Sequence, residues 1–140
     1  MNTLKLILLI AQACLFFYCL PARAGEVPEV TPKALLLSHA VMCESIDNFK
    51  PQNPAIVFSI DLGKVFCFTT FDQIKETTYI YHKWFQMDRL VSRKKLTLKP
   101  PKWSTISSMQ LRMADRGPWY VEITDKNDTL LQRLRFSISD

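Results

Sequence analysis

Apolar and aromatic residues come in short runs along this chain, and turn residues separate the runs. After residue 33, the runs span residues 34–43, 55–61, 64–71, 76–85, 90–98, 103–111, 119–124 and 129–138. They are rich in β-branched and aromatic side chains, a composition typical of β-strands. Prolines interrupt the pattern at 49–54 and 99–102. No helical period is evident in this part of the chain, so the pattern predicts strands throughout.

The number and spacing of these runs predict an all-β fold, an antiparallel Ig-like β-sandwich of about seven to eight strands. The clearest unit is the last pair of runs, which the polar turn DKND joins into a hairpin. Alternating residues of a strand point to the same face of the sheet. One apolar face is therefore expected for each strand of this hairpin, formed by Trp119, Val121 and Ile123 and by Leu130, Leu134, Phe136 and Ile138.

The stretch YIYHKWF, residues 79–85, places a histidine two positions before a tryptophan. In an extended strand, His82 and Trp84 share one face, while Tyr81 and Lys83 share the other. We expect His82 to have a structural role near the edge of the core, with its ring nitrogens hydrogen-bonded. The other large core residues predicted from the pattern are Trp84, Trp103, Trp119 and Phe136.

The first 24 residues have the three parts of a secretory signal peptide, which are a basic residue, an apolar run and a small-residue cleavage pattern ending at Ala24. Cleavage there would remove Lys5 and Arg23 and lower the net charge from +5 to +3. Residues 25–33 then form an extended leader and residues 34–140 a single domain. The expected location is periplasmic or extracellular. The alternative is an uncleaved inner-membrane anchor formed by residues 6–20.

Cleavage would also leave Cys43 and Cys67 as an even pair in an oxidising compartment. We therefore predict that they form a disulfide, which would stabilise so small a domain by roughly 3 to 4 kcal/mol. The alternative is two buried free thiols that act as small apolar side chains.

Basic residues concentrate between positions 83 and 102, where Asp88 is the single acid. Within the run 90–98, Arg93 and Lys95 point one way and Lys94 the other, which predicts a basic strand edge. Such an edge protects a sheet from aggregation. It is also a candidate docking surface for an anionic envelope component or another protein, whereas nucleic acid is disfavoured by the exported location. The candidate binding residues are Arg89, Arg93, Lys94, Lys95, Lys99 and Lys102.

Sequence signatures of catalysis are missing from the chain. Its three glycines are too far apart for a phosphate-binding loop, and no CxxC, HExxH or GxSxG pattern occurs. The second histidine, His39, is more than forty residues from His82. The sequence therefore indicates no catalytic residues, no metal site and no cofactor.

Several stretches appear in an order that resembles the bacterial domain of unknown function 2914 family. They are VFCFT (65–69), YHKW (81–84), KWSTISS (102–108), GPWYVEI (117–123) and LLQRLRFSI (130–138). The chain departs from the family pattern at Thr105-Ile106, where an arginine-tryptophan step is frequent, and at Met87-Asp88, where a glycine turn is common. The resemblance implies a fold and a setting in the cell envelope, and it brings no known activity.

These observations together predict a non-catalytic interaction module at the bacterial cell envelope. A second hypothesis is an enzyme, or an accessory domain of one, that uses His82 in a groove with Tyr81 and Arg93. A third is a structural subunit of an oligomer that pairs through an exposed strand edge.

Overall fold

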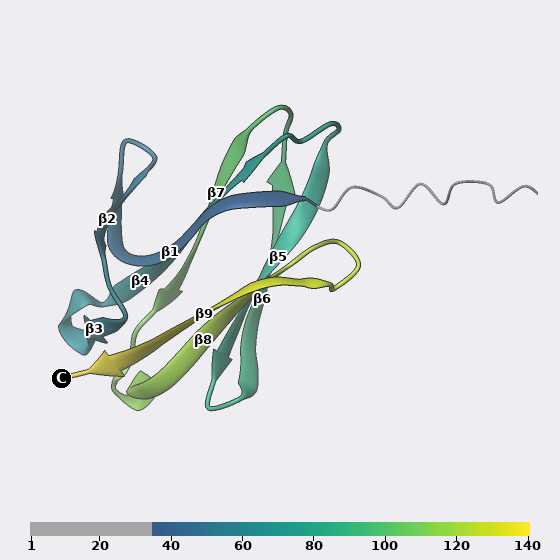
Figure 1. Ribbon diagram of the computed structural model, residues 1–140. Helices are drawn as coiled ribbons and strands as arrows, with labels where there is room; N and C mark the ends of the chain where they lie inside the picture. Colours follow the sequence, from purple (N-terminus) through teal and green to yellow (C-terminus); the bar gives the residue numbers. More distant parts are fainter. Residues whose placement is uncertain (1–34) are drawn as a thin grey trace, which may run out of the picture. The chain divides into compact units, whose positions relative to one another are not determined.

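The structure is a computed structural model that describes residues 35–140, and these residues form one compact unit. Nine strands and two short 3₁₀ helices make up the fold (Figure 1). The strands are β1 (Leu36–Asp47), β2 (Lys50–Pro54), β3 (Val57–Ser59), β4 (Lys64–Asp72), β5 (Thr78–Gln86), β6 (Arg89–Leu98), β7 (Trp103–Gln110), β8 (Gly117–Thr124) and β9 (Leu130–Ser139). The 3₁₀ helices are η1 (Ile60–Leu62) and η2 (Met113–Asp115).

The predicted β-sandwich is confirmed, with nine strands in two sheets. The first sheet has the order β2-β1-β4-β7, and the second has the order β3-β9-β8-β5-β6. All neighbouring strands are antiparallel except the short β3, which runs parallel to β9. The strands β2, β7, β3 and β6 are therefore the edges of the sandwich.

Large aromatic residues fill one half of the core between the sheets. The ring of Phe136 on β9 lies 6.0 to 6.2 Å from the rings of Phe58, Trp84 and Trp119. Trp84, Trp119 and Phe136 are buried, as the alternation in β5, β8 and β9 predicts. A second cluster, which includes Phe71, Ile80 and Leu98, fills the other half.

The strand β2 was not predicted, because its two prolines indicated a break. Proline lacks an amide donor and is accepted in a sheet only where that donor is not needed, as on an edge strand. The residues 50–54 meet this condition, since β2 is an edge and pairs with β1 alone. In Figure 1 the β1–β2 hairpin projects from the rest of the sandwich.

The predicted disulfide is absent, because Cys43 and Cys67 are buried free thiols. In the pairing of β1 with β4, Cys67 lies opposite Met42, and Cys43 lies opposite Phe66. Opposed residues share a face and successive residues alternate, so the two cysteine side chains point to opposite faces of the same sheet. The strands are close enough for a bond, but the orientation prevents it.

Two apolar residues are more exposed than predicted. Trp103 begins the edge strand β7 and is 38% exposed, with Lys99 Nζ 5.5 Å from its ring centre. Leu130 is also exposed, because a register shift at Ile123/Thr124 displaces the start of β9 relative to β8. Both residues lie at strand ends, where one side of the side chain lacks a covering neighbour.

The predicted signal peptide, its cleavage after Ala24 and the leader 25–33 lie outside the described residues. Within residues 35–140, no helix is long and apolar enough to cross a membrane.

Candidate functional site

The centre of the sandwich contains a buried hydrogen-bonded network around His82. From β5, the His82 ring points between the sheets, where its Nδ1 lies 2.7 Å from Ser107 Oγ and its Nε2 lies 3.1 Å from Thr69 Oγ1. Trp84 Nε1 donates to the same Ser107 oxygen at 3.1 Å. Thr69 in turn contacts Thr105 Oγ1 at 2.7 Å. The network thus joins β5 of one sheet to β4 and β7 of the other.

Both ring nitrogens of His82 face a hydroxyl oxygen, so the neutral ring can donate from one nitrogen and accept at the other. The Trp84 indole can only donate, so Ser107 Oγ accepts from it. Because His82 is fully buried, desolvation lowers the pKa of its ring from 6.5 to about 3. The ring is neutral at physiological pH. Both its nitrogens are hydrogen-bonded, as expected from the sequence, but the ring is fully buried and does not lie near the edge of the core.

The structure does not bring together the residues of the hypothetical enzyme site. His82 points into the core, whereas the neighbouring Tyr81 lies on the outer face of the same sheet. Arg93 is also on that outer face, with its guanidinium 3.7 Å from the Tyr81 ring centre. Residues 35–140 contain no cluster of three or more His, Cys, Asp or Glu side chains that could hold a metal ion.

The predicted basic edge is the edge strand β6 together with the connection that follows it. Arg93 lies opposite Lys83, and Lys95 lies opposite Tyr81, so both point to the outer face. Lys94 lies opposite His82 and points to the other side, although its own side chain is exposed at the rim of the sandwich. All six predicted binding residues are exposed, and we call them the β6 edge: Arg89, Arg93, Lys94, Lys95, Lys99 and Lys102.

Aromatic rings hold several of these cations in place. Lys95 Nζ lies 4.0 Å from the Tyr79 ring centre, in addition to the Arg93 contact with Tyr81. A cation above an aromatic face is stabilised by about 0.5 to 1 kcal/mol at an exposed site. The tyrosines of β5 therefore restrict the rotamers of cations that would otherwise move freely in solvent.

Acidic side chains neutralise only part of the β6 edge. Asp128, in the β8–β9 turn, contacts Lys83 at 2.8 Å and Arg93 at 3.1 Å. The hydrogen bond from Lys83 and the charges of both cations lower the pKa of Asp128, so this carboxylate is ionised at neutral pH. Among the described residues, Lys94 and Lys95 have no acidic partner within ion-pair distance.

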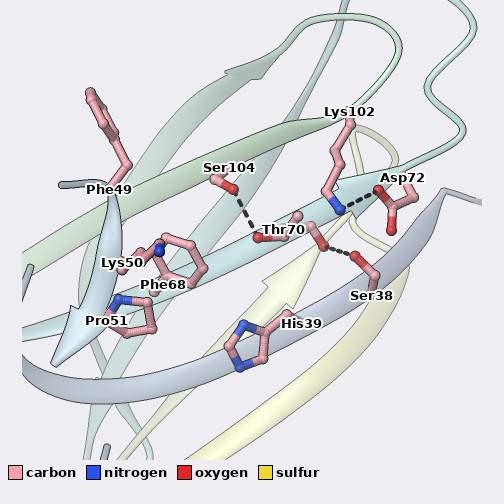
Figure 2. A pocket seen from close by; sticks show the side chains of 10 residues that line it. All are labelled: Ser38, His39, Phe49, Lys50, Pro51, Phe68, Thr70, Asp72, Lys102 and Ser104. Carbon is pink, nitrogen blue, oxygen red and sulfur yellow. Dashed lines mark hydrogen bonds and ion pairs between the residues drawn. The ribbon is translucent and has the colours of Figure 1, made fainter. Parts of the chain in front are cut away.

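A groove of about 580 Å³ lies on the outer face of the other sheet, beside the β1–β2 hairpin (Figure 2). Its floor is formed by β4 and β7, where Thr70 Oγ1 contacts Ser104 Oγ at 2.8 Å. Ser38 Oγ donates to the carbonyl oxygen of Thr70 at 3.1 Å. Ten residues line the groove: Ser38, His39, Phe49, Lys50, Pro51, Phe68, Thr70, Asp72, Lys102 and Ser104.

One end of this groove meets the β6 edge through Lys102, whose Nζ lies 3.3 Å from Asp72. The neighbouring Ser38 hydroxyl, and after it the interaction with Lys102, lowers the pKa of Asp72. The imidazole of His39 packs edge-on against Phe68, with ring centres 5.7 Å apart. The groove thus combines three aromatic rings, those of His39, Phe49 and Phe68, with several hydroxyl groups and charged side chains.

The sequence did not predict this groove. It depends on β2, whose prolines concealed the strand, and on residues from four separate strands. A signal was present at Asn48, a residue that tolerates positive φ and therefore favours a tight hairpin turn.

Comparison with known families agrees with the resemblance noted in the sequence. Residues 77–138 match the model of a family described as a protein of unknown function (DUF2914). This stretch contains β5, β6, β7, β8 and β9 except its last residue, and so includes all six residues of the β6 edge and every residue of the His82 network except Thr69. The VFCFT stretch lies outside the matched residues. No curated protein matches the chain.

Proposed function

We propose that this protein is an exported, non-catalytic interaction module of the bacterial cell envelope and that it binds an anionic partner along the β6 edge. One observation carries the proposal, which is that Arg93 and Lys95 are held on tyrosine rings at an exposed sheet edge. Solvated lysines that serve only to prevent aggregation need no such support. Cations fixed in advance lose less side-chain entropy on binding, and this favours association.

The accompanying charges support the same proposal. Lys94 and Lys95 lack acidic partners among residues 35–140, so an incoming anion would not have to displace an internal ion pair from either residue. The long side chains of β6 point to both sides of the strand, and the surface therefore suits an extended or planar partner that covers the edge. Such a partner is an acidic polysaccharide or the headgroups of anionic lipids.

The test measures binding of protein purified from cells that express the full chain. Polygalacturonate and vesicles containing phosphatidylglycerol are the anionic probes, and dextran and phosphatidylcholine vesicles are the neutral ones. The variant Lys94→Ser/Lys95→Ser is compared with Lys64→Ser/Arg116→Ser, which removes the same charge outside the β6 edge. At about 1 kcal/mol per cation near an anionic surface, the first variant is expected to weaken binding roughly thirtyfold.

The salt dependence provides the second readout. Binding to an anionic probe should weaken as ionic strength rises, and the β6 variant should show a smaller salt effect than the control. Equal affinities of the two variants for every probe would contradict the proposal. So would equal binding to anionic and neutral probes.

A further inference from the structure

The groove beside the β1–β2 hairpin is a second surface with features of a binding site. It lies on the outer face of the β2-β1-β4-β7 sheet, whereas the strand β6 belongs to the other sheet. Its volume of about 580 Å³ lies within the range of about 300 to 1,000 Å³ that is common for small-molecule sites.

Phe49 is the most unusual residue of the groove. It is 80% exposed, and Figure 2 shows its ring standing clear of the other side chains that line the groove. Phe49 occupies the second position of the two-residue turn between Asp47 and Lys50, with φ of +58°. Glycine is preferred at this position of a type I′ turn, because L-residues with side chains are strained at positive φ. An exposed aromatic residue with a strained backbone indicates a function other than stability.

The groove's polar groups suit a ligand rich in hydroxyl groups. The Ser38, Thr70 and Ser104 hydroxyls lie along the floor. Ser38 donates its hydrogen to the Thr70 carbonyl oxygen, and one of Thr70 and Ser104 donates to the other, so one hydroxyl hydrogen and the remaining lone pairs are available to a ligand. At the hairpin end of the groove, the exposed Phe49 ring provides an apolar surface of the kind that packs against the C–H face of a pyranose ring. An aromatic face beside a row of hydroxyls is complementary to a sugar, which is apolar on its faces and polar at its rim.

The charges of the groove favour a ligand with a carboxylate. Lys50 and Lys102 line it together with one acid, Asp72. Asp72 already interacts with Lys102 at 3.3 Å, which leaves Lys50 as a cation without an acidic partner within residues 35–140. The side chain of Lys102 is 66% exposed and retains free donor positions for a second anion.

We infer that this groove binds an acidic sugar residue, a hexuronate of a polysaccharide chain. The pyranose ring packs on Phe49, its hydroxyls form hydrogen bonds with Thr70 and Ser104, and its carboxylate pairs with Lys50. The groove and the β6 edge share Lys102 alone, and the inferred carboxylate partner is Lys50, so binding at the groove can be tested separately from binding along the β6 edge.

The experiment uses trigalacturonate as the probe and its fully methyl-esterified form as the matched neutral control. Binding is followed by NMR on protein purified from cells that express the full chain, through the ring signals of His39 and Phe49 and the amides of β6. Trigalacturonate is expected to shift the His39 and Phe49 signals, and the ester is expected to do so only at concentrations roughly tenfold higher or more.

Two substitutions at equivalent turn positions test the role of the ring. Phe49→Gly removes the ring and suits the positive φ, and it should weaken binding roughly tenfold. Asp88→Gly makes the same change in the β5–β6 turn, where Asp88 has φ of +62°, and should leave binding at the groove unchanged. The two variants are both expected to fold, because glycine relieves strain at each position.

Three results would overturn the inference. The first is that trigalacturonate does not shift the NMR signals of His39 and Phe49. If it shifts only the β6 amides, the further inference fails and the proposed function stands. The second is equal binding of the acid and its ester, since the carboxylate would have no role. The third is a groove that responds to phosphatidylglycerol bicelles and not to trigalacturonate, which would identify a lipid headgroup as the ligand.

Discussion

The buried His82 ring predicts a loss of stability in mild acid. In the unfolded chain the imidazole has its ordinary pKa of 6.5, whereas burial lowers the pKa in the folded protein to about 3. Between these values the unfolded state binds a proton that the folded state rejects. The stabilisation is therefore fully present above pH 6.5 and is lost as the pH falls toward 3.

The size of this effect follows from the gap between the two pKa values. One unit corresponds to about 1.4 kcal/mol. At pH 4.5 the unfolded chain is protonated at His82 and the folded protein is not, so the free energy of unfolding is lower by roughly 2 to 3 kcal/mol than at pH 7.5. Below pH 3 the loss reaches roughly 4 to 5 kcal/mol. A domain of this size is stable by about 5 to 15 kcal/mol, so the effect is a large part of the total.

Urea unfolding at pH 7.5 and pH 4.5, followed by tryptophan fluorescence, measures this loss. The variant His82→Gln is uncharged at both pH values, and its amide can donate to Thr69 and accept from Ser107. It should be less stable than the wild type at pH 7.5 and should lose less stability on acidification. The carboxylates Asp72 and Asp128 also titrate toward low pH, but they are present in both proteins and cancel in the comparison.

The variant His39→Gln is the control for the histidine substitution, because His39 is exposed. It should follow the wild-type pH dependence. If His82→Gln lost as much stability as the wild type between the two pH values, burial of a neutral His82 could not be the cause. Wild-type NMR gives a separate check, since the His82 ring signals should remain those of a neutral imidazole at pH 4.5.

Three further predictions concern other parts of the molecule. Ser107→Ala leaves the His82 and Trp84 nitrogens without their shared partner and should lower the free energy of unfolding by roughly 2 to 4 kcal/mol, measured in urea. The control Ser108→Ala, on the outer face, should lower it little, and equal losses in the two variants would contradict the network. Phe49→Gly should raise stability by about 1 kcal/mol, and a destabilised variant would show that the turn is not strained. Burial raises the pKa of both Cys43 and Cys67, so their thiols should resist iodoacetamide in the folded protein and react in non-reducing denaturant; continued resistance in denaturant would reveal a disulfide.

Alternation along single strands made much of the fold predictable from the sequence. His82 and Trp84 are buried and Tyr81 is not because β5 lies between two other strands with one face in the core. The same rule separated Lys94 from Arg93 and Lys95. These inferences need only the identity of a strand and its period of two.

Features that depend on pairing between strands were not predictable. The orientation of Cys43 and Cys67 follows from the register that places Met42 opposite Cys67, and a shift of one residue would have turned one thiol toward the other. Trp103 is exposed because β7 is an edge, which no local pattern reveals. The groove required both the concealed strand β2 and the position of its hairpin above β4.

Alternation also connects the core network to the groove on one sheet and to the β6 edge on the other. On β4, Thr69 belongs to the network, and its neighbour Thr70 forms the floor of the groove. On β5, His82 belongs to the network, and its neighbour Tyr81 supports Arg93. A hydrogen bond that fixes Thr69 or His82 also fixes the backbone that positions the neighbouring outward side chain. Burial keeps His82 neutral until the pH approaches 3. Its protonation at that point should disturb the groove and the β6 edge together, in the same transition as the core.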